Sequence, residues 1–212
     1  MQQAIFQCWS VIVRWMEVYY PSGLKTLRPA AENKALARLT SHFPLLPTVL
    51  VESLALHDGE DEPGILYGHY QLLSAEAIIE YWYELLQFCS VNDCLFHSND
   101  KQLCGGRFGI GRVPFAVNRN TQSQYLCIDL NPGIEGIMAQ VIEVDFDHLT
   151  LFYLEKSYTG FLATYANGLH TGRYEISKQG NQLVLNKHFV SFFYQHLSSF
   201  QLTTDSLKAC FY

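Results

Sequence analysis

The sequence has 212 residues, of which 49% are hydrophobic and 14% aromatic; this suits one domain with a real core, alone or with a helical extension, and excludes a disordered chain. The net charge of −6 is unevenly distributed, because residues 39–155 hold sixteen acidic and four basic residues, a balance of −12, while each flanking segment is at +3. An acidic centre repels phosphate backbones and attracts basic partners, so we expect no nucleic-acid binding.

The sequence predicts neither a targeting segment nor a membrane-spanning one. The chain starts Met1-Gln2-Gln3, without the basic stretch and small-residue cleavage site of a signal peptide. We therefore expect a cytoplasmic location with reduced thiols. The longest apolar stretch, Ala4 to Met16, is interrupted by polar residues and falls short of the ~18 apolar residues that a spanning helix needs, so no membrane insertion is expected.

Two helices are predicted in the first part of the chain. Apolar residues recur at helical spacing from Ile5 to Tyr19, which is typical of an amphipathic helix that ends near Pro21. A second short helix is predicted over residues 31–39. Residues 1–29 thus form an N-terminal helix and linker in this interpretation.

A third helix is predicted between two turn signals. Pro47 suits the first helical position, and Gly59 of His57-Asp58-Gly59 suits the position after the helix, where His57 is a favourable cation. The charge run Glu60-Asp61-Glu62 then predicts an exposed loop. Residues 65–67 and 70–72 predict a hairpin or a bent strand.

A long helix and a long loop are predicted next. Ser74 is a suitable N-cap for a helix whose apolar residues from Ile78 to Leu86 face inward. From Cys89 to Gly111 the composition becomes polar and glycine-rich without periodicity. This change predicts a long loop.

Consecutive strands dominate the following part of the chain. Short turns between them indicate an antiparallel meander, with strands near residues 113–118, 124–130, 137–146 and 149–154. The predicted fold class is α+β, with a mixed, largely antiparallel sheet of about six strands flanked by helices. We place the main domain at residues 30–172.

The C-terminal part is predicted to pack on the same domain. Ser157 caps a helix, and residues 174–176 and 183–185 form a small hairpin. A last amphipathic helix carries Phe189 and Phe200. Residues 173–212 therefore add a hairpin and a helix.

The most strongly specified stretch runs from Val113 to Val144. Two apolar strands flank the turn Asn131-Pro132-Gly133, in which Asn accepts backbone hydrogen bonds, Pro restricts φ and Gly supplies a positive φ. Asp129 and Gly136 belong to the same turn. We interpret this group as turn architecture rather than as a binding or catalytic site.

Several short motifs occur along the chain in a specific order. They are Glu32, Leu46-Pro47, His57-Asp58-Gly59, a Trp-bearing helix, Val113-Pro114-Phe115-Ala116, Ile128-Asp129-Leu130-Asn131-Pro132-Gly133, Gly136, Gln140-Val141-Ile142 and Ser157. This order resembles the SUKH superfamily, which includes bacterial immunity proteins and fungal regulators of cell-wall synthesis. We take as its structural signature Pro47, His57, Asp58, Gly59, Pro114, Asp129, Asn131, Pro132, Gly133, Gly136 and Gln140.

The resemblance extends to the N-terminus and has three departures. The amphipathic helix with Trp9 and Trp15 is similar to the extension of the regulator-like branch. Gly111-Arg112-Val113 and Thr121-Gln122-Ser123-Gln124 stand where family members often carry a Trp and a Gly-Asp. Ala139 stands where family members usually have glycine before Gln-Val.

The resemblance implies a non-catalytic protein that works by binding, without a cofactor. Our leading expectation is an immunity protein that neutralises a basic toxin, such as a nuclease, through its acidic surface. The contacts would be Glu60, Asp61, Glu62, Glu135, Asp145 and Asp147. Ordinary surface charges are an equally good interpretation of any one of these residues.

Two other functions remain open. A cell-wall synthesis regulator or scaffolding protein would share the fold, and the N-terminal aromatic helix favours it, whereas the absence of long tails favours an immunity protein. The third is a hydrolase using His57, Asp58 or a loop cysteine. No HExxH, GxSxG or Walker motif supports a hydrolase.

The predicted loop also raises the question of a ligand. Cys89, Cys94, His97 and Cys104 are chemically able to bind zinc, but their spacing lacks the tight Cys-x2-Cys pair, so we predict no metal site. The glycines of residues 105–111 resemble a phosphate loop only superficially, because they precede a strand rather than a helix.

Overall fold

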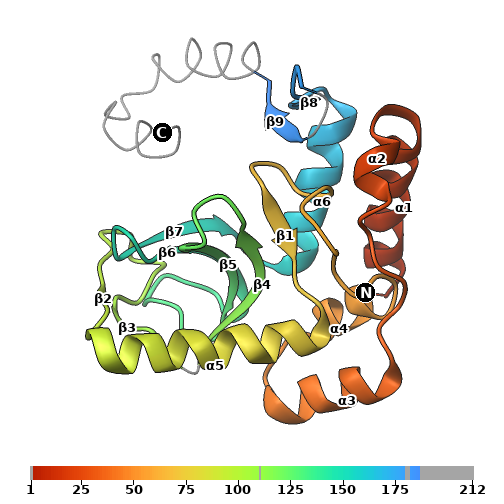
Figure 1. Ribbon diagram of the computed structural model, residues 1–212. Helices are drawn as coiled ribbons and strands as arrows, with labels where there is room; N and C mark the ends of the chain where they lie inside the picture. Colours follow the sequence, from red (N-terminus) through yellow and green to blue (C-terminus); the bar gives the residue numbers. More distant parts are fainter. Residues whose placement is uncertain (1, 110, 180–181, 187–212) are drawn as a thin grey trace.

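The computed structural model describes residues 2–109, 111–179 and 182–186. Helices dominate the first part of this structure (Figure 1). They are α1 (Gln2–Tyr19), α2 (Pro21–Leu24), α3 (Asn33–His42), α4 (Thr48–Leu54) and α5 (Ala75–Asn92), with the short strand β1 (Tyr70–Leu72) between α4 and α5. Helix α6 (Tyr158–His170) follows the main strands.

The central element is a five-stranded sheet in the order β1-β4-β5-β6-β7, and each neighbouring pair is antiparallel. Its remaining strands are β4 (Arg112–Asn118), β5 (Gln124–Asp129), β6 (Gln140–Asp145) and β7 (Thr150–Glu155). The predicted α+β class is confirmed, and so is the meander of β4 to β7. The sheet has five strands where about six were expected, because residues 65–67 form no strand and β1 pairs with β4 instead.

Two small ribbons accompany the sheet. Strands β2 (Leu95–Phe96) and β3 (Gly106–Arg107) pair with each other, and so do β8 (Tyr174–Ile176) and β9 (Leu183–Leu185). The β8–β9 hairpin agrees with the prediction. The loop expected over 89–111 starts later, since α5 continues to Asn92 and Asp93 ends it in the left-handed conformation.

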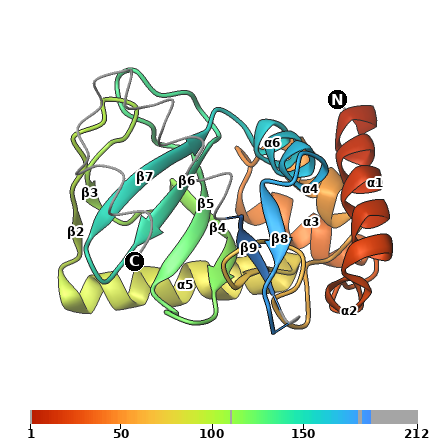
Figure 2. The same cartoon turned by 90° about the horizontal axis from the view of Figure 1, so that it is seen from above.

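The helices form two groups around the sheet. Helix α5 runs along one face of the sheet, and α1 and α6 lie side by side, with α6 in contact with β6 and β7 (Figures 1 and 2). A buried polar chain links the helices: the Trp9 indole donates to Ser53 Oγ at 2.7 Å, and Ser53 Oγ lies 3.0 Å from Tyr158 Oη. Because Ile5, Ile12 and Met16 are fully buried, α1 contributes to the core.

The two N-cap residues predicted from the sequence, Ser74 and Ser157, are confirmed. Ser74 Oγ accepts from the Ala77 N–H at 3.1 Å, and Ser157 Oγ accepts from the Gly160 N–H at 3.1 Å. Each hydroxyl satisfies one of the N–H groups that a helix start leaves unpaired. The predicted last helix, with Phe189 and Phe200, lies outside the described residues.

The end of the third helix differs from the prediction. Pro47 is the N-cap rather than the first helical residue, and α4 ends at Leu54, well before Gly59. Gly59 has a φ of +73° and packs against the backbone of Leu72 to Ser74, where a Cβ would lie 2.7 Å from the Leu72 carbonyl oxygen. Its role is therefore to bring this turn close to β1, not to end α4.

The turn before β6 contains a strained alanine. Ala139 has a φ of +66°, a region that costs an L-residue roughly 1–2 kcal/mol. We predict that Ala139→Gly raises the free energy of unfolding by about 0.5–1 kcal/mol, because glycine adopts this φ without steric cost. Urea denaturation measures the change.

The exposed Ala163 in α6 is the matched control. There the same Ala→Gly change should lower stability by about 1 kcal/mol, since glycine is a poor helix former. A loss of stability at both positions would contradict the assignment of strain to Ala139.

Candidate partner-binding surface

The six predicted contact acids divide into buried and exposed residues. Glu60, expected in an exposed loop, is only 4% exposed, and Asp145 is likewise 4% exposed. Asp61, Glu62, Glu135 and Asp147 are exposed. Glu60 and Asp145 therefore cannot serve as surface contacts, which corrects the prediction for these two residues.

Glu60 is buried because the surrounding backbone supplies hydrogen-bond donors. Its Oε1 accepts from the N–H groups of Gly64 at 2.9 Å and Ile65 at 2.6 Å and from Thr26 Oγ1 at 3.1 Å. Its Oε2 accepts from the Leu72 N–H at 2.8 Å. Burial raises the pKa of Glu60 to about 7, although these hydrogen bonds act in the opposite direction. The carboxyl thus joins the segment that follows α2, the 60–65 loop and β1.

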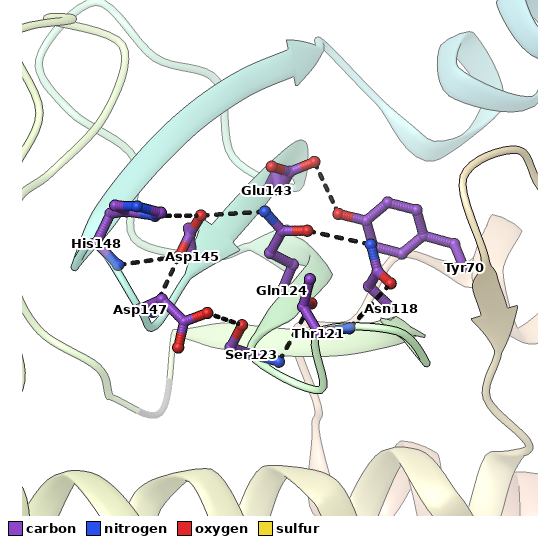
Figure 3. A network of polar contacts seen from close by, with 9 residues as sticks. All are labelled: Tyr70, Asn118, Thr121, Ser123, Gln124, Glu143, Asp145, Asp147 and His148. Carbon is purple, nitrogen blue, oxygen red and sulfur yellow. Dashed lines mark hydrogen bonds and ion pairs between the residues drawn. The ribbon is translucent and has the colours of Figure 1, made fainter. Parts of the chain in front are cut away.

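Asp145 is the centre of a polar network at one end of the sheet (Figure 3). It accepts from the backbone N–H groups of Asp147 at 2.9 Å and His148 at 3.0 Å, and from the Gln124 amide at 3.1 Å. Its Oδ2 also lies 3.0 Å from His148 Nδ1. Asp145 therefore organises the turn between β6 and β7.

The titration of this pair follows from its contacts. Burial alone would raise the pKa of Asp145, but hydrogen bonds from Gln124 and His148 hold it below the ordinary 3.8. The hydrogen bond to Asp145 raises the pKa of the exposed His148 above the ordinary 6.5. Between pH 3.8 and pH 6.5, Asp145 is therefore ionised and His148 is protonated, so both members of the ion pair are charged.

A second carboxyl in the network contacts a phenol from another strand. Tyr70 of β1 donates to Glu143 Oε2 of β6 at 2.8 Å, and the two side chains point toward each other in Figure 3. Burial and the neighbouring Glu143 raise the pKa of Tyr70, and burial raises the pKa of Glu143. The phenol is therefore held as a hydrogen-bond donor and is not activated as a nucleophile.

The exposed acids lie in three different turns. Asp61 pairs with Arg28 at 3.8 Å, and Glu135 pairs with Lys101 at 3.1 Å. Asp147 accepts from Ser123 Oγ at 2.6 Å. Their surface positions leave them as candidate contacts.

The turn between β5 and β6 is fixed by a buried amide. Gln140 is fully buried, and its Nε2 donates to the Gln102 carbonyl at 2.8 Å and to Asp129 Oδ2 at 2.9 Å. Its Oε1 accepts from the Ile137 N–H at 3.0 Å. Asp129 in turn accepts from the Asn131 N–H at 3.1 Å. These contacts assign Asp129 and Gln140 to the support of the turn.

Gly133 and Gly136 have a role other than the predicted one. Neither has a positive φ. A Cβ on Gly133 would collide with the Lys101 carbonyl oxygen, and a Cβ on Gly136 would collide with that of Gln102. The glycines are needed because the turn packs directly on the backbone of residues 101–103.

This supported turn displays apolar side chains that the sequence reading missed. In residues 131–139, here called the Ile134 loop, the side chains of Ile134, Ile137 and Met138 are 94%, 53% and 56% exposed. Three large apolar residues so close together on a well-supported loop are a feature of interaction sites. The only available signal was the run Ile134-Glu135-Gly136-Ile137-Met138 itself, which is apolar inside a turn.

The residues considered for zinc binding are not grouped in the described part of the chain. Within residues 2–109, 111–179 and 182–186, no three His, Cys, Asp or Glu side chains are grouped to hold a metal, so Cys89, Cys94, His97 and Cys104 form no zinc set. Asp58 Oδ1 accepts from the Ala75 N–H at 2.7 Å, at the start of α5.

His57 is half-buried rather than a helix-end cation. Its ring packs on Trp9 with ring centroids 4.9 Å apart, and burial lowers its pKa.

In the described part of the chain, no helix combines the length and apolar character needed to cross a membrane.

Comparison with known proteins identifies relatives of one kind. No protein-family model matches the chain. A glucan synthesis regulatory protein of Neurospora crassa is 23% identical over 217 aligned positions, covering 84% of this chain and 41% of the relative. The cell wall biosynthesis/cell cycle regulator smi1 of Schizosaccharomyces pombe is 27% identical, covering 85% of this chain and 39% of the relative.

These matches confirm the resemblance to the SUKH superfamily. The chain spans about two fifths of the length of the curated relatives it matches. Both relatives are named as fungal regulators of the cell wall or of glucan synthesis, and neither is named as an immunity protein.

The burial of Glu60 predicts a specific cost for its amide isostere. Glu60→Gln places an NH2 group against one of the donors that now face the carboxylate, leaving a buried N–H unpaired. We expect the free energy of unfolding to fall by roughly 1–3 kcal/mol in a denaturant titration at pH 8. The exposed Glu62→Gln should leave stability unchanged; equal effects of the two changes would contradict the buried role of Glu60.

The Asp145–His148 pair predicts a pH-dependent effect of His148→Ala. Because the pKa of His148 is raised on folding, the pair contributes stability that is fully present below pH 6.5 and is lost as the pH rises through the raised pKa. Because the pKa of Asp145 is lowered on folding, it contributes stability that is present above pH 3.8 and is lost as the pH falls through the lowered pKa. Thermal unfolding should therefore reveal a larger destabilisation near pH 5 than near pH 8. In an Asp145→Asn background this pH dependence should vanish, and its persistence there would refute the pairing.

Proposed function

We propose that this chain is a non-catalytic protein-binding module of a cell-wall synthesis regulator. The observation that carries the proposal is the match of 84% and 85% of the chain to two proteins named as such regulators. Because the match covers less than half of each relative, the proposal concerns the module and assigns to it the recognition of a protein partner.

The Ile134 loop supports a binding role. Its apolar side chains are exposed, whereas its backbone is held by Gln140 and by contacts of Gly133 and Gly136 with residues 101–103. A loop that is already ordered loses little conformational entropy on binding, so more of the contact energy is available for affinity. We therefore place the main partner contact at Ile134, Ile137 and Met138.

The immunity function has weaker support. It rested on a continuous acidic surface, and two of its six contact residues, Glu60 and Asp145, are buried in structural hydrogen-bond networks. The curated relatives are regulators. The hydrolase alternative gains no observation in its favour.

A domain exchange tests the proposal. The region of S. pombe smi1 that matches this chain is replaced by the chain, and the chimera is expressed in a strain lacking smi1. We expect wall β-glucan incorporation to return toward the level of the parent strain. A stable, well-expressed chimera that leaves glucan incorporation at the deletion level would refute the proposal.

The same assay tests the assigned surface. Ile134→Ser should abolish most of the rescue, because it removes an apolar side chain that a partner would cover. Val91→Ser is the matched control, since Val91 is 78% exposed but lies on α5, outside the Ile134 loop. Equal loss in the two variants would rule out the loop as the main contact.

A further inference from the structure

A cavity of about 380 Å³ lies next to the Ile134 loop. Its lining is Leu45, Arg107, Gly109, Gly111, Arg112, Leu130 and Asn131. Asn131 is the first residue of the Ile134 loop, so the cavity adjoins the start of that loop. Two of its seven lining residues are arginines, although residues 39–155 contain only four basic side chains of Lys and Arg.

Arg112 is a buried cation that forms no ion pair with a described residue. It is 3% exposed, and its guanidinium donates to the carbonyl oxygens of Cys104 and Arg107 and lies 5.9 Å from the Phe96 ring centroid. Its Nε has no hydrogen-bond partner in the described part of the chain. Burying a charge without a close counterion is costly, so this site favours an anion.

Asp129 is the nearest candidate counterion, but its oxygens are used elsewhere. It stands opposite Arg112 in the register of β4 and β5. Its Oδ1 accepts from the Asn131 N–H and its Oδ2 from the Gln140 amide. Asp129 therefore moderates the field of Arg112 without occupying the cavity.

Arg107 lines the same cavity and has an exposed side chain. Its side chain is 69% exposed and pairs with Asp93 at 2.5 Å. An exposed ion pair of this kind contributes only about 0–1 kcal/mol, so an incoming anion can replace Asp93 at little cost. Gly109 leaves the wall beside it open, since a Cβ there would meet only the Arg107 carbonyl oxygen at 3.9 Å.

We propose that this cavity binds a phosphate group, with Arg107 as the direct ligand and Arg112 as the buried charge in the wall. A phosphate monoester carries about −1.5 to −2 charges at pH 7, which matches two guanidinium groups better than one carboxylate does. The apolar Leu45 and Leu130 suit the carbon chain that carries the phosphate. That the carrier is a phosphorylated partner protein rests on the proposed function; phosphate binding itself does not.

Calorimetric titration of the full chain with inorganic phosphate and with a phosphoserine peptide tests the site. We expect both to bind, the peptide more tightly, with affinity that falls as NaCl is added. Arg107→Gln should weaken binding roughly tenfold. Lys101→Gln is the matched control, because Lys101 is 72% exposed, is also ion-paired, and does not line the cavity; it should leave the affinity unchanged.

The outcomes separate the two sources of phosphate. If the peptide binds no more tightly than inorganic phosphate, the site stands but takes a free anion rather than a partner. Absence of binding by both ligands, or equal weakening by Arg107→Gln and Lys101→Gln, overturns the site. Neither result depends on glucan rescue by the chimera, so failure of the site and failure of the proposed function are distinguishable.

Discussion

The geometry of the proposed contact surface depends on one fully buried amide. The Gln140 amide donates to Gln102 and Asp129 and accepts from Ile137. It therefore joins β5 and β6 to the loop before β3 and to the turn that precedes β6. A hydrophobic residue of similar size would fill the space but leave these buried polar groups unpaired. The exposed Ile134 loop is therefore positioned from the interior.

The acidic composition of the chain divides between scaffold and surface. Three of the acids are buried where backbone N–H groups and amides donate to their oxygens: Glu60, Asp129 and Asp145. Each carboxylate accepts from a backbone N–H group that has no carbonyl partner in a helix or strand. Their charges act mainly on neighbouring donors. The balance of −12 in the central segment thus overstates the negative charge at the surface, because three of these acids are buried.

Features that depend on neighbouring residues could be predicted from the sequence. Features that depend on contacts between residues far apart in the chain could not, and these determine much of the candidate site. The Ser74 and Ser157 caps and the β4–β7 meander depend on neighbouring residues, so the pattern alone identifies them. Glu60 is buried partly because the Leu72 N–H donates to its carboxylate, and the run Glu60-Asp61-Glu62 gives no sign of this contact. Gly133 and Gly136 were rightly placed in a turn, but the need for glycine comes from residues 101–103, far away in sequence.

Several polar groups of the interior are held in their protonated forms. Burial raises the pKa of the Cys127 thiol and raises those of Tyr125 and Tyr158 to about 12, so these groups stay protonated, whereas a catalytic nucleophile needs its pKa lowered. Held in this form, Tyr125 Oη donates to the Gln122 carbonyl at 3.1 Å. A core of such donors gives a stiff frame, and stiffness is what a small exposed loop needs to bind without first being ordered.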